Sequence, residues 1–211
     1  IGDEQMLRRA GVPVVAPAPV GLRTADHPEW VLPTDWPTAP SRPVLEVLLS
    51  LSIGVEIRPY TGGFIAMAGD GGAGQPDWPH IGVALMKPRA RGEVRLVSAD
   101  AAVPPAIAHH YDSEPEDLAT LQLGADTARE LASAATHVGD PQWSTSQHLC
   151  GTAPMGADGD EAAVLDTRCR VRGVDGLWVI DGSIMPSIPS RGPHATTVAL
   201  AHRAAEFVVA G

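Results

Sequence analysis

Short apolar runs separated by turn residues dominate the first half of the chain. They cover residues 44–57, 63–68, 81–86 and 92–97, with Gly, Pro and Asp between them. Runs of this length, bounded by turn residues, are typical of β-strands. We therefore predict an antiparallel sheet layer here, preceded by a shorter strand at 12–15.

Three segments show helical spacing instead, and they cover 3–10, 114–135 and 196–209. The middle segment starts with acidic residues, and its apolar residues then recur on one helical face. These residues are Leu118, Leu121, Ala125, Ala128, Leu131 and Ala132. Because the predicted strands and helices occupy separate stretches, we expect an α+β fold with an antiparallel sheet and packed helices.

Irregular segments connect these elements. Residues 16–43 are Pro-rich and polar, so we expect an irregular excursion that contributes to a pocket rim. The Gly-rich segment 69–74 predicts a flexible turn, because the helix that a nucleotide-binding loop requires does not follow it. Near the end of the chain, a buried strand is predicted at 177–180, directly before Asp181.

Size and charge exclude some classes of function. The chain has 211 residues, of which 44% are hydrophobic, and this is enough for a core in one or two soluble domains. Its formal net charge is −10 and no Lys/Arg cluster stands out, so no nucleic-acid partner is expected. The longest apolar run, 44–57, contains two glutamates and is shorter than the ~20 residues of a bilayer span, so no membrane span is expected.

The first residue and the two cysteines bear on cellular context. The chain starts with Ile and shows no secretion leader, so we expect it to begin within a longer protein. Cys150 and Cys169 form neither a close metal pair nor a disulfide framework. Reduced thiols and a cytoplasmic location are therefore expected, with Cys150 filling space rather than reacting.

Two histidines in glycine-framed loops are the main candidates for chemistry. They are His148 and His194, separated by 194 − 148 = 46 residues. The pKa of histidine suits acid and base work near neutral pH, and glycine lets backbone approach a ligand closely. We expect the pair to converge on one site. The adjacent pair His109-His110 is expected to pack rather than chelate a metal, and Asp26-His27 to organise a loop.

Three motifs carry a family resemblance, and they span His148 to Gly156, Gly176 to Pro186, and His194 to Thr196. In this order they resemble the C-terminal end of the glucose-methanol-choline (GMC) flavoprotein oxidoreductases. Upstream pieces at 11–15, 26–28, 91–96 and 104–107 resemble family landmarks in the same order. The sequence around His148 and at 190–194 is also similar to that of family members associated with the mycofactocin redox system.

The resemblance implies FAD as cofactor and oxidation of a small-molecule alcohol. His148 would accept the hydroxyl proton while the carbon delivers hydride to the flavin. His194 matches a position where the family carries His or Asn, hydrogen-bonded to the same oxygen. With two histidines the protonation states would be coupled.

Flavin contacts are implied at Ala195 and Thr196, where the start of the terminal helix favours negative charge on the reduced ring. Capping of that helix by a threonine is compatible with this role. Asp181 and Gly182 would also approach the cofactor, although the family more often has Asp-Ala-Ser here. A simple turn at the end of a strand is the alternative for these two residues.

The Gly-x-Gly-x-x-Gly unit that binds the ADP half of FAD in this family is absent from the sequence. We therefore expect a missing N-terminal FAD-binding portion, with 1–11 ending a segment of the FAD domain. Residues 12–139 would form the substrate domain, and 140–211 the catalytic loop and the return to the FAD domain. The electron acceptor is left open among oxygen, a quinone and a mycofactocin-type carrier.

Two alternatives come from other classes of function. The chain could be a non-catalytic binding or scaffold module that kept the fold. It could also be a hydrolase that uses His148 and an acidic partner, although no serine-elbow or metal signature is visible.

Overall fold

The computed structural model describes residues 1–37, 43–63, 65, 69, 74, 77–132 and 137–209. The chain forms two compact units. Unit 1 consists of Ile1–Asp26, Ala90–Tyr111 and His148–Gly211, and unit 2 consists of His27–Arg89 and Asp112–Gln147. These boundaries differ from the three predicted segments. The predicted segments concern domains of a longer enzyme, and that division stays a prediction.

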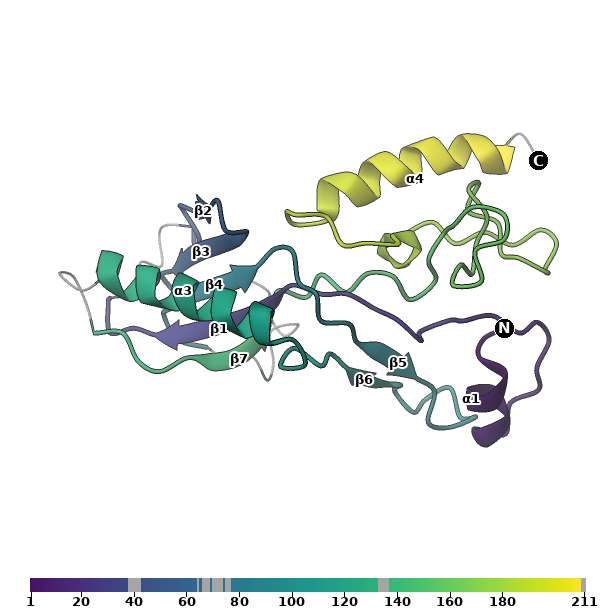
Figure 1. Cartoon of the computed structure of the whole chain (residues 1–211), viewed down its shortest axis with the longest axis horizontal. Coiled ribbons are helices and arrows are strands. Elements are labelled where there is room, and N and C mark those ends of the chain that lie inside the picture. The colour runs from purple at the N-terminus through teal and green to yellow at the C-terminus, as the bar shows by residue number, and fades with distance from the viewer. Residues whose placement is uncertain are drawn as a thin grey trace. The chain divides into compact units, whose positions relative to one another are not determined.

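Unit 2 contains a five-stranded sheet in the order β2-β3-β4-β1-β7 (Figure 1). The strands are β1 (Pro28–Pro33), β2 (Leu49–Leu51), β3 (Val55–Tyr60), β4 (His80–Leu85) and β7 (Gln142–Thr145). Every neighbouring pair is antiparallel. The predicted antiparallel layer is therefore confirmed.

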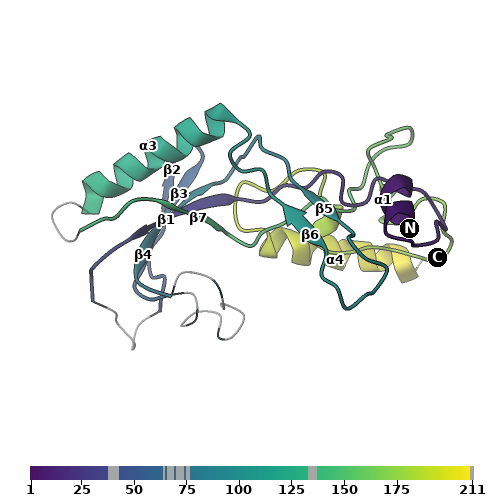
Figure 2. The same ribbon diagram turned by 90° about the horizontal axis from the view of Figure 1, so that it is seen from below.

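Helix α3 (Pro115–Ala132) covers one face of this sheet (Figure 2). Its buried residues Leu121, Ala125 and Ala128 pack with apolar side chains of the strands, as the predicted helical face required. These strand residues are Leu32, Val55, Ile57, Ile81, Val83 and Leu85. Leu131 was predicted on the same face, but its side chain is 62% exposed.

Gly124 sets how closely α3 approaches the sheet. A Cβ atom at this position would lie 2.7 Å from Cγ1 of Val83 and 2.8 Å from Cγ1 of Val55. Both distances are shorter than real contacts allow, so the helix lies too close to the strands for any side chain here.

Strand β1 corrects the prediction of an irregular excursion at 16–43. It lies between β4 and β7 and has prolines at both ends, Pro28 and Pro33. A proline at a strand end costs few ladder hydrogen bonds, so Glu29, Trp30 and Val31 still pair with both neighbouring strands. Most of the segments predicted at 63–68 and 69–74 lies outside the described residues, which include only Gly63, Ile65, Gly69 and Gly74 there.

Unit 1 has fewer regular elements. They are α1 (Glu4–Arg9), β5 (Glu93–Arg95), β6 (Ala106–Ala108), the 3-10 turn η2 (Gly182–Ile184) and α4 (His194–Val209). As predicted, a short helix starts after Asp3, whose side chain accepts a hydrogen bond from the backbone N–H of Met6 at 2.8 Å. β5 and β6 form a two-stranded antiparallel sheet.

Two predicted strands of unit 1 are absent from the described chain. Residues 12–15 have no strand pairing, and the prolines Pro13 and Pro17 lack the N–H groups that a ladder needs. Residues 177–180 form only an isolated bridge between Trp178 and Arg170, and Leu177 is 39% exposed. The latter segment was therefore wrongly predicted as a buried strand.

Helix α4 starts two residues earlier than predicted and is mostly exposed. Of its 16 residues only Ala204 is buried, while Val198 is 54% and Val208 42% exposed. Its apolar exposed face is typical of a helix that packs against further polypeptide. No helix in the described part of the chain is long and apolar enough to cross a bilayer.

Candidate active site

His148 is the first residue of unit 1 after the chain leaves unit 2. Its backbone N–H donates to Oδ1 of Asp26 at 2.9 Å. Its half-buried imidazole lies against Gly192, because a Cβ on that glycine would be 3.7 Å from Cε1 and 3.8 Å from Nε2. The ring therefore lies beside the loop that leads into α4.

His194 is the first residue of α4, and it is exposed together with Ala195 and Thr196. The N–H and the hydroxyl of Thr197 both donate to the carbonyl of Pro193, at 2.8 and 3.0 Å. Proline has no side-chain acceptor that could cap the helix. The N–H groups of the first turn therefore begin the helix without a cap from the preceding residue, a geometry that attracts anions.

Asp181 and Gly182 form the turn η2. The Asp181 carboxylate accepts hydrogen bonds from the N–H of Ser183, at 2.8 Å, and from the hydroxyl of the same serine. The Gly182 carbonyl accepts from the N–H of Gly151 at 3.4 Å. The turn therefore lies against the loop that follows His148, and the Asp181 side chain caps it, as the turn alternative expected.

The structure thus brings three predicted segments together within unit 1. The His148 imidazole lies beside Gly192, two residues before His194, and the loop after His148 is hydrogen-bonded to Gly182. The roles of these residues toward substrate and cofactor stay predictions.

The Asp26 carboxylate holds the backbone of this loop by a hydrogen bond. Its carboxylate is 5% exposed and accepts from the N–H of His148 and, at 2.7 Å, from the hydroxyl of Tyr111. The Tyr111 ring stacks on the imidazole of His109, with centroids 4.6 Å apart. These contacts confirm that Asp26 organises a loop and that His109 packs. β6 ends before His109, so the two adjacent histidines do not lie on a strand.

Among the described residues, no group of three or more His, Cys, Asp or Glu side chains could hold a metal ion.

Cys150 is 1% exposed and lies within the same loop. Its thiol contacts the carbonyl of His148 at 3.1 Å and the sulfur of Met185 at 3.9 Å. Burial raises the pKa of this thiol to about 11, and the charges of Asp26 and Asp181 act in the same direction. The thiol is therefore neutral at physiological pH, which agrees with the predicted space-filling role.

A cavity of about 400 Å³ opens in unit 1 beside the same loop. Its lining includes Thr24, Ala25, Arg91, Gly151, Met155 and Pro186. Neither candidate histidine lines it, so the cavity adjoins the loop after His148 without containing either imidazole.

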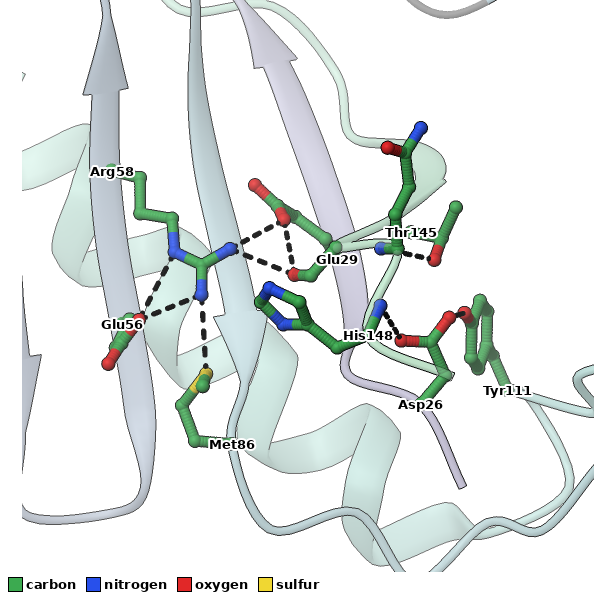
Figure 3. A network of polar contacts seen from close by, with 10 residues as sticks. Asp26, Glu29, Glu56, Arg58, Met86, Tyr111, Thr145 and His148 are labelled. Atoms are coloured by element: carbon green, nitrogen blue, oxygen red, sulfur yellow. Dashed lines mark hydrogen bonds and ion pairs between the residues drawn. The ribbon is translucent and has the colours of Figure 1, made fainter. Parts of the chain in front are cut away.

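Unit 2 contains a buried charge network that the sequence did not predict (Figure 3). The guanidinium of Arg58 donates to Glu56 through Nε and Nη2, to Glu29 and Ser146 through Nη1, and to the sulfur of Met86 through Nη2. These five contacts use all five of its N–H donors. Burial alone would lower the pKa of Arg58, but Glu29, Tyr60 and Glu56 outweigh it and raise the pKa.

This network lies on the sheet face opposite α3. Glu56 and Arg58 are two residues apart in β3, and residues with this spacing point to the same face of a strand. Glu29, Glu56 and Arg58 are 1%, 3% and 6% exposed. No prediction from the sequence covered the burial of this polar face.

Several known proteins of similar sequence are named as oxidoreductases or dehydrogenases. An uncharacterised GMC-type oxidoreductase in the thcA 5′ region of Rhodococcus erythropolis is 38% identical, over 99% of this chain and 45% of that protein. Oxygen-dependent choline dehydrogenase of Vibrio vulnificus is 32% identical over 58% of this chain and 26% of that protein. The chain spans less than half the length of these curated relatives.

Solved structures show the same fold. Pyridoxine 4-oxidase from Mesorbium loti superposes with a TM-score of 0.80 at 22% identity, over 98% of this chain and 47% of that one. Formate oxidase gives a TM-score of 0.80 at 19% identity, over 99% of this chain and 50% of that one. The α+β fold expected for the C-terminal part of such enzymes is therefore confirmed.

The family profile described as GMC oxidoreductase matches residues 88–201, more than half of the chain. FAD is the cofactor of that family, as the resemblance implied. The chain belongs to the GMC oxidoreductase family.

Proposed function

We propose that this chain supplies the substrate pocket and the catalytic histidines of an FAD-dependent enzyme that oxidises a CH–OH group. One observation carries the proposal: the imidazole of His148 lies against Gly192, at the entrance to α4. This is the place where an alcohol would meet both a base and the first turn of a helix.

Oxidation of an alcohol to a carbonyl removes a proton from oxygen and a hydride from carbon. His148 would take the hydroxyl proton, and its backbone hydrogen bond to Asp26 would keep the ring in place. His194 would hydrogen-bond the same oxygen and orient the C–H bond. Bound FAD would supply the hydride acceptor, which no side chain can provide.

The residues around α4 fit a bound flavin. The exposed N–H groups of Ala195 and Thr196 would face negative charge on the reduced ring, because the helix start carries the positive end of its dipole. At Gly182 a Cβ would meet its nearest protein atoms at 3.8 Å, an ordinary contact. There is therefore room within the chain for glycine or for the alanine that the family more often has, and either would let the backbone approach a bound flavin.

The exposed apolar face of α4 supports a further expectation: a missing N-terminal FAD-binding portion would cover it. The relatives named above are at least twice as long as the matched region, which leaves room for that portion. The substrate would be a small alcohol.

The specific substrate and the electron acceptor are not carried over from relatives. Their names refer to choline, pyridoxine and formate, which differ widely. Oxygen, a quinone and a mycofactocin-type carrier are the acceptor classes to compare, and the mycofactocin link rests on the sequence around His148 and Ser190 to His194.

The test is His148→Ala in the complete flavin-loaded enzyme that contains this chain. Flavin reduction by an alcohol substrate is followed in anaerobic stopped flow, so that the acceptor plays no part. We expect the reduction rate per bound flavin to fall by about 10²–10⁴-fold with unchanged flavin content, because a general base is lost.

His137→Ala is the matched control, because this exposed histidine belongs to unit 2 and lies outside the proposed site. It should leave the reduction rate unchanged. Unaltered reduction in His148→Ala would instead favour the non-catalytic module, and loss of flavin with normal reduction per bound flavin would reassign His148 to cofactor binding.

A further inference from the structure

Gln147, directly before His148, has a left-handed backbone with φ of 58°. Only two other described non-glycine residues, His110 and Cys169, share this feature. A non-glycine residue adopts a positive φ at a cost in free energy, so this conformation persists where neighbouring contacts hold the backbone. The contacts on either side of Gln147 therefore need an explanation.

On the N-terminal side, Ser146 is fixed within unit 2. Its N–H donates to the His27 carbonyl at 3.2 Å, and its hydroxyl donates to Oε2 of Glu29 at 2.6 Å. Arg58 donates to the same hydroxyl at 2.8 Å. The N–H of Gln147 itself donates to the hydroxyl of Thr145 at 2.9 Å.

On the C-terminal side, His148 is fixed within unit 1 by the hydrogen bonds to the Asp26 carboxylate (Figure 3). One oxygen accepts from the N–H of His148, and the other accepts from the hydroxyl of Tyr111. We call this pair of hydrogen bonds the Asp26 clamp. Stacking of Tyr111 on His109 holds the hydroxyl end of the clamp.

We propose that Asp26 is a positioning residue, whose clamp holds the backbone of Gln147 and His148 in a strained geometry that directs the imidazole toward Gly192. The proposal rests on the proposed role of His148. Without the clamp, Gln147 would relax to an ordinary φ, and that rotation would turn the His148 side chain away. A base that is displaced by about 1 Å loses roughly 10²-fold in rate.

Three variants separate the hydrogen bonds of the clamp from the charge of Asp26. Asp26→Ala removes the acceptor, and we expect flavin reduction to slow by about 10²-fold in the complete enzyme. Asp26→Asn keeps an acceptor for the N–H of His148, while its amide can donate to Tyr111, so we expect a loss of only about threefold. Tyr111→Phe removes one hydrogen bond and should give an intermediate loss.

The strain is tested in the Asp26→Ala background. Gln147→Gly should restore part of the rate, about tenfold, because glycine adopts a positive φ without cost. Gln147→Ala is the matched control and should restore nothing, since alanine keeps the Cβ that makes this φ unfavourable. Equal rates for the two double variants would overturn the role of strain, and Asp26→Asn as slow as Asp26→Ala would overturn the role of the hydrogen bond.

A second readout does not depend on catalysis. Hydrogen exchange followed by mass spectrometry on peptides spanning 144–150 should show about tenfold faster exchange in Asp26→Ala and near-native exchange in Asp26→Asn. Unchanged exchange in Asp26→Ala would overturn the proposal. If His148→Ala leaves flavin reduction intact while Asp26→Ala accelerates exchange, the clamp stands and the proposed function fails.

Discussion

The two units differ in how they hold their shape. In unit 2, five paired strands and α3 enclose one apolar core, and a saturated guanidinium network fills the opposite face of the sheet. In unit 1, long loops are joined by isolated bridges around a second apolar core. The predicted catalytic and cofactor residues of this unit lie in the loop at His148, at the turn η2 and in the first turn of α4. The predicted site residues thus lie in a loop and at the starts of short elements, outside the paired strands that organise unit 2.

The difference also concerns where charge is buried. Unit 2 buries a full charge network at Arg58, whereas the ion pair of Arg95 with Glu93 in unit 1 stays at the surface, with the arginine side chain 57% exposed. Buried and exposed pairs of similar length therefore allow a direct comparison.

The largest expected effect comes from Arg58→Ala. Removal of the guanidinium leaves Glu29 and Glu56 buried without their shared partner, so we expect a loss of about 3–5 kcal/mol in the free energy of unfolding. Urea unfolding followed by tryptophan fluorescence measures it, because four of the five tryptophans belong to unit 2. Arg95→Ala should change stability little, and equal losses would erase the contrast between the units.

The next effect concerns α3. Leu121 is fully buried and Leu131 is 62% exposed on the same helix. Leu121→Ala should lower the free energy of unfolding by about 2–5 kcal/mol through lost burial and a cavity, whereas Leu131→Ala should cost about 0.5 kcal/mol or less. The same urea titration compares them. Similar costs would mean that α3 packs with the face that the sequence pattern first indicated.

The smallest effect depends on pH and concerns unit 1. The pKa of Cys150 is about 11 in the folded chain against an ordinary value of 9.0. The folded state therefore holds the thiol proton more tightly, so this contribution to stability is fully present below pH 9 and is lost as pH rises toward 11. The slope is at most about 1.4 kcal/mol per pH unit.

Cys150→Ala should flatten this alkaline decline, as measured by urea unfolding followed by circular dichroism between pH 8 and 11. Cys169→Ala is the comparison, because burial also raises the pKa of that thiol. A decline of the same steepness in Cys150→Ala would place the responsible group elsewhere.

Much of unit 2 could be predicted, because its apolar residues follow the periods of strand and helix. α3 and β4 fall where the pattern indicated, whereas the run predicted at 44–57 is divided by a turn into β2 and β3. Strand β7 was not predicted. β1 was missed, since Pro28 and Pro33 imitate a loop although they lie only at the strand ends. The segment 177–180 was overpredicted, because an apolar run cannot show whether a neighbouring strand is present to pair with it.

The candidate site was predicted only in part. Motif resemblance selected His148 and His194, and the structure places the loops that carry them in contact. A glutamine side chain does not favour a left-handed backbone, so the sequence gives no sign of the positive φ at Gln147. Glu56 is a near neighbour of Arg58 in β3, but Glu29, Ser146 and Met86 come from three other stretches of chain, and only folding brings them to the guanidinium.

The absence of a Cβ atom at Gly124 determines how closely α3 packs on the sheet of unit 2. Since Val55 and Val83 already occupy the space of a β-carbon there, even alanine would have to lift α3 off the strands or bend them. An engineer who grafts a new surface onto this helix can change its outward side freely. At Gly124, however, any added side chain would change the spacing between helix and sheet.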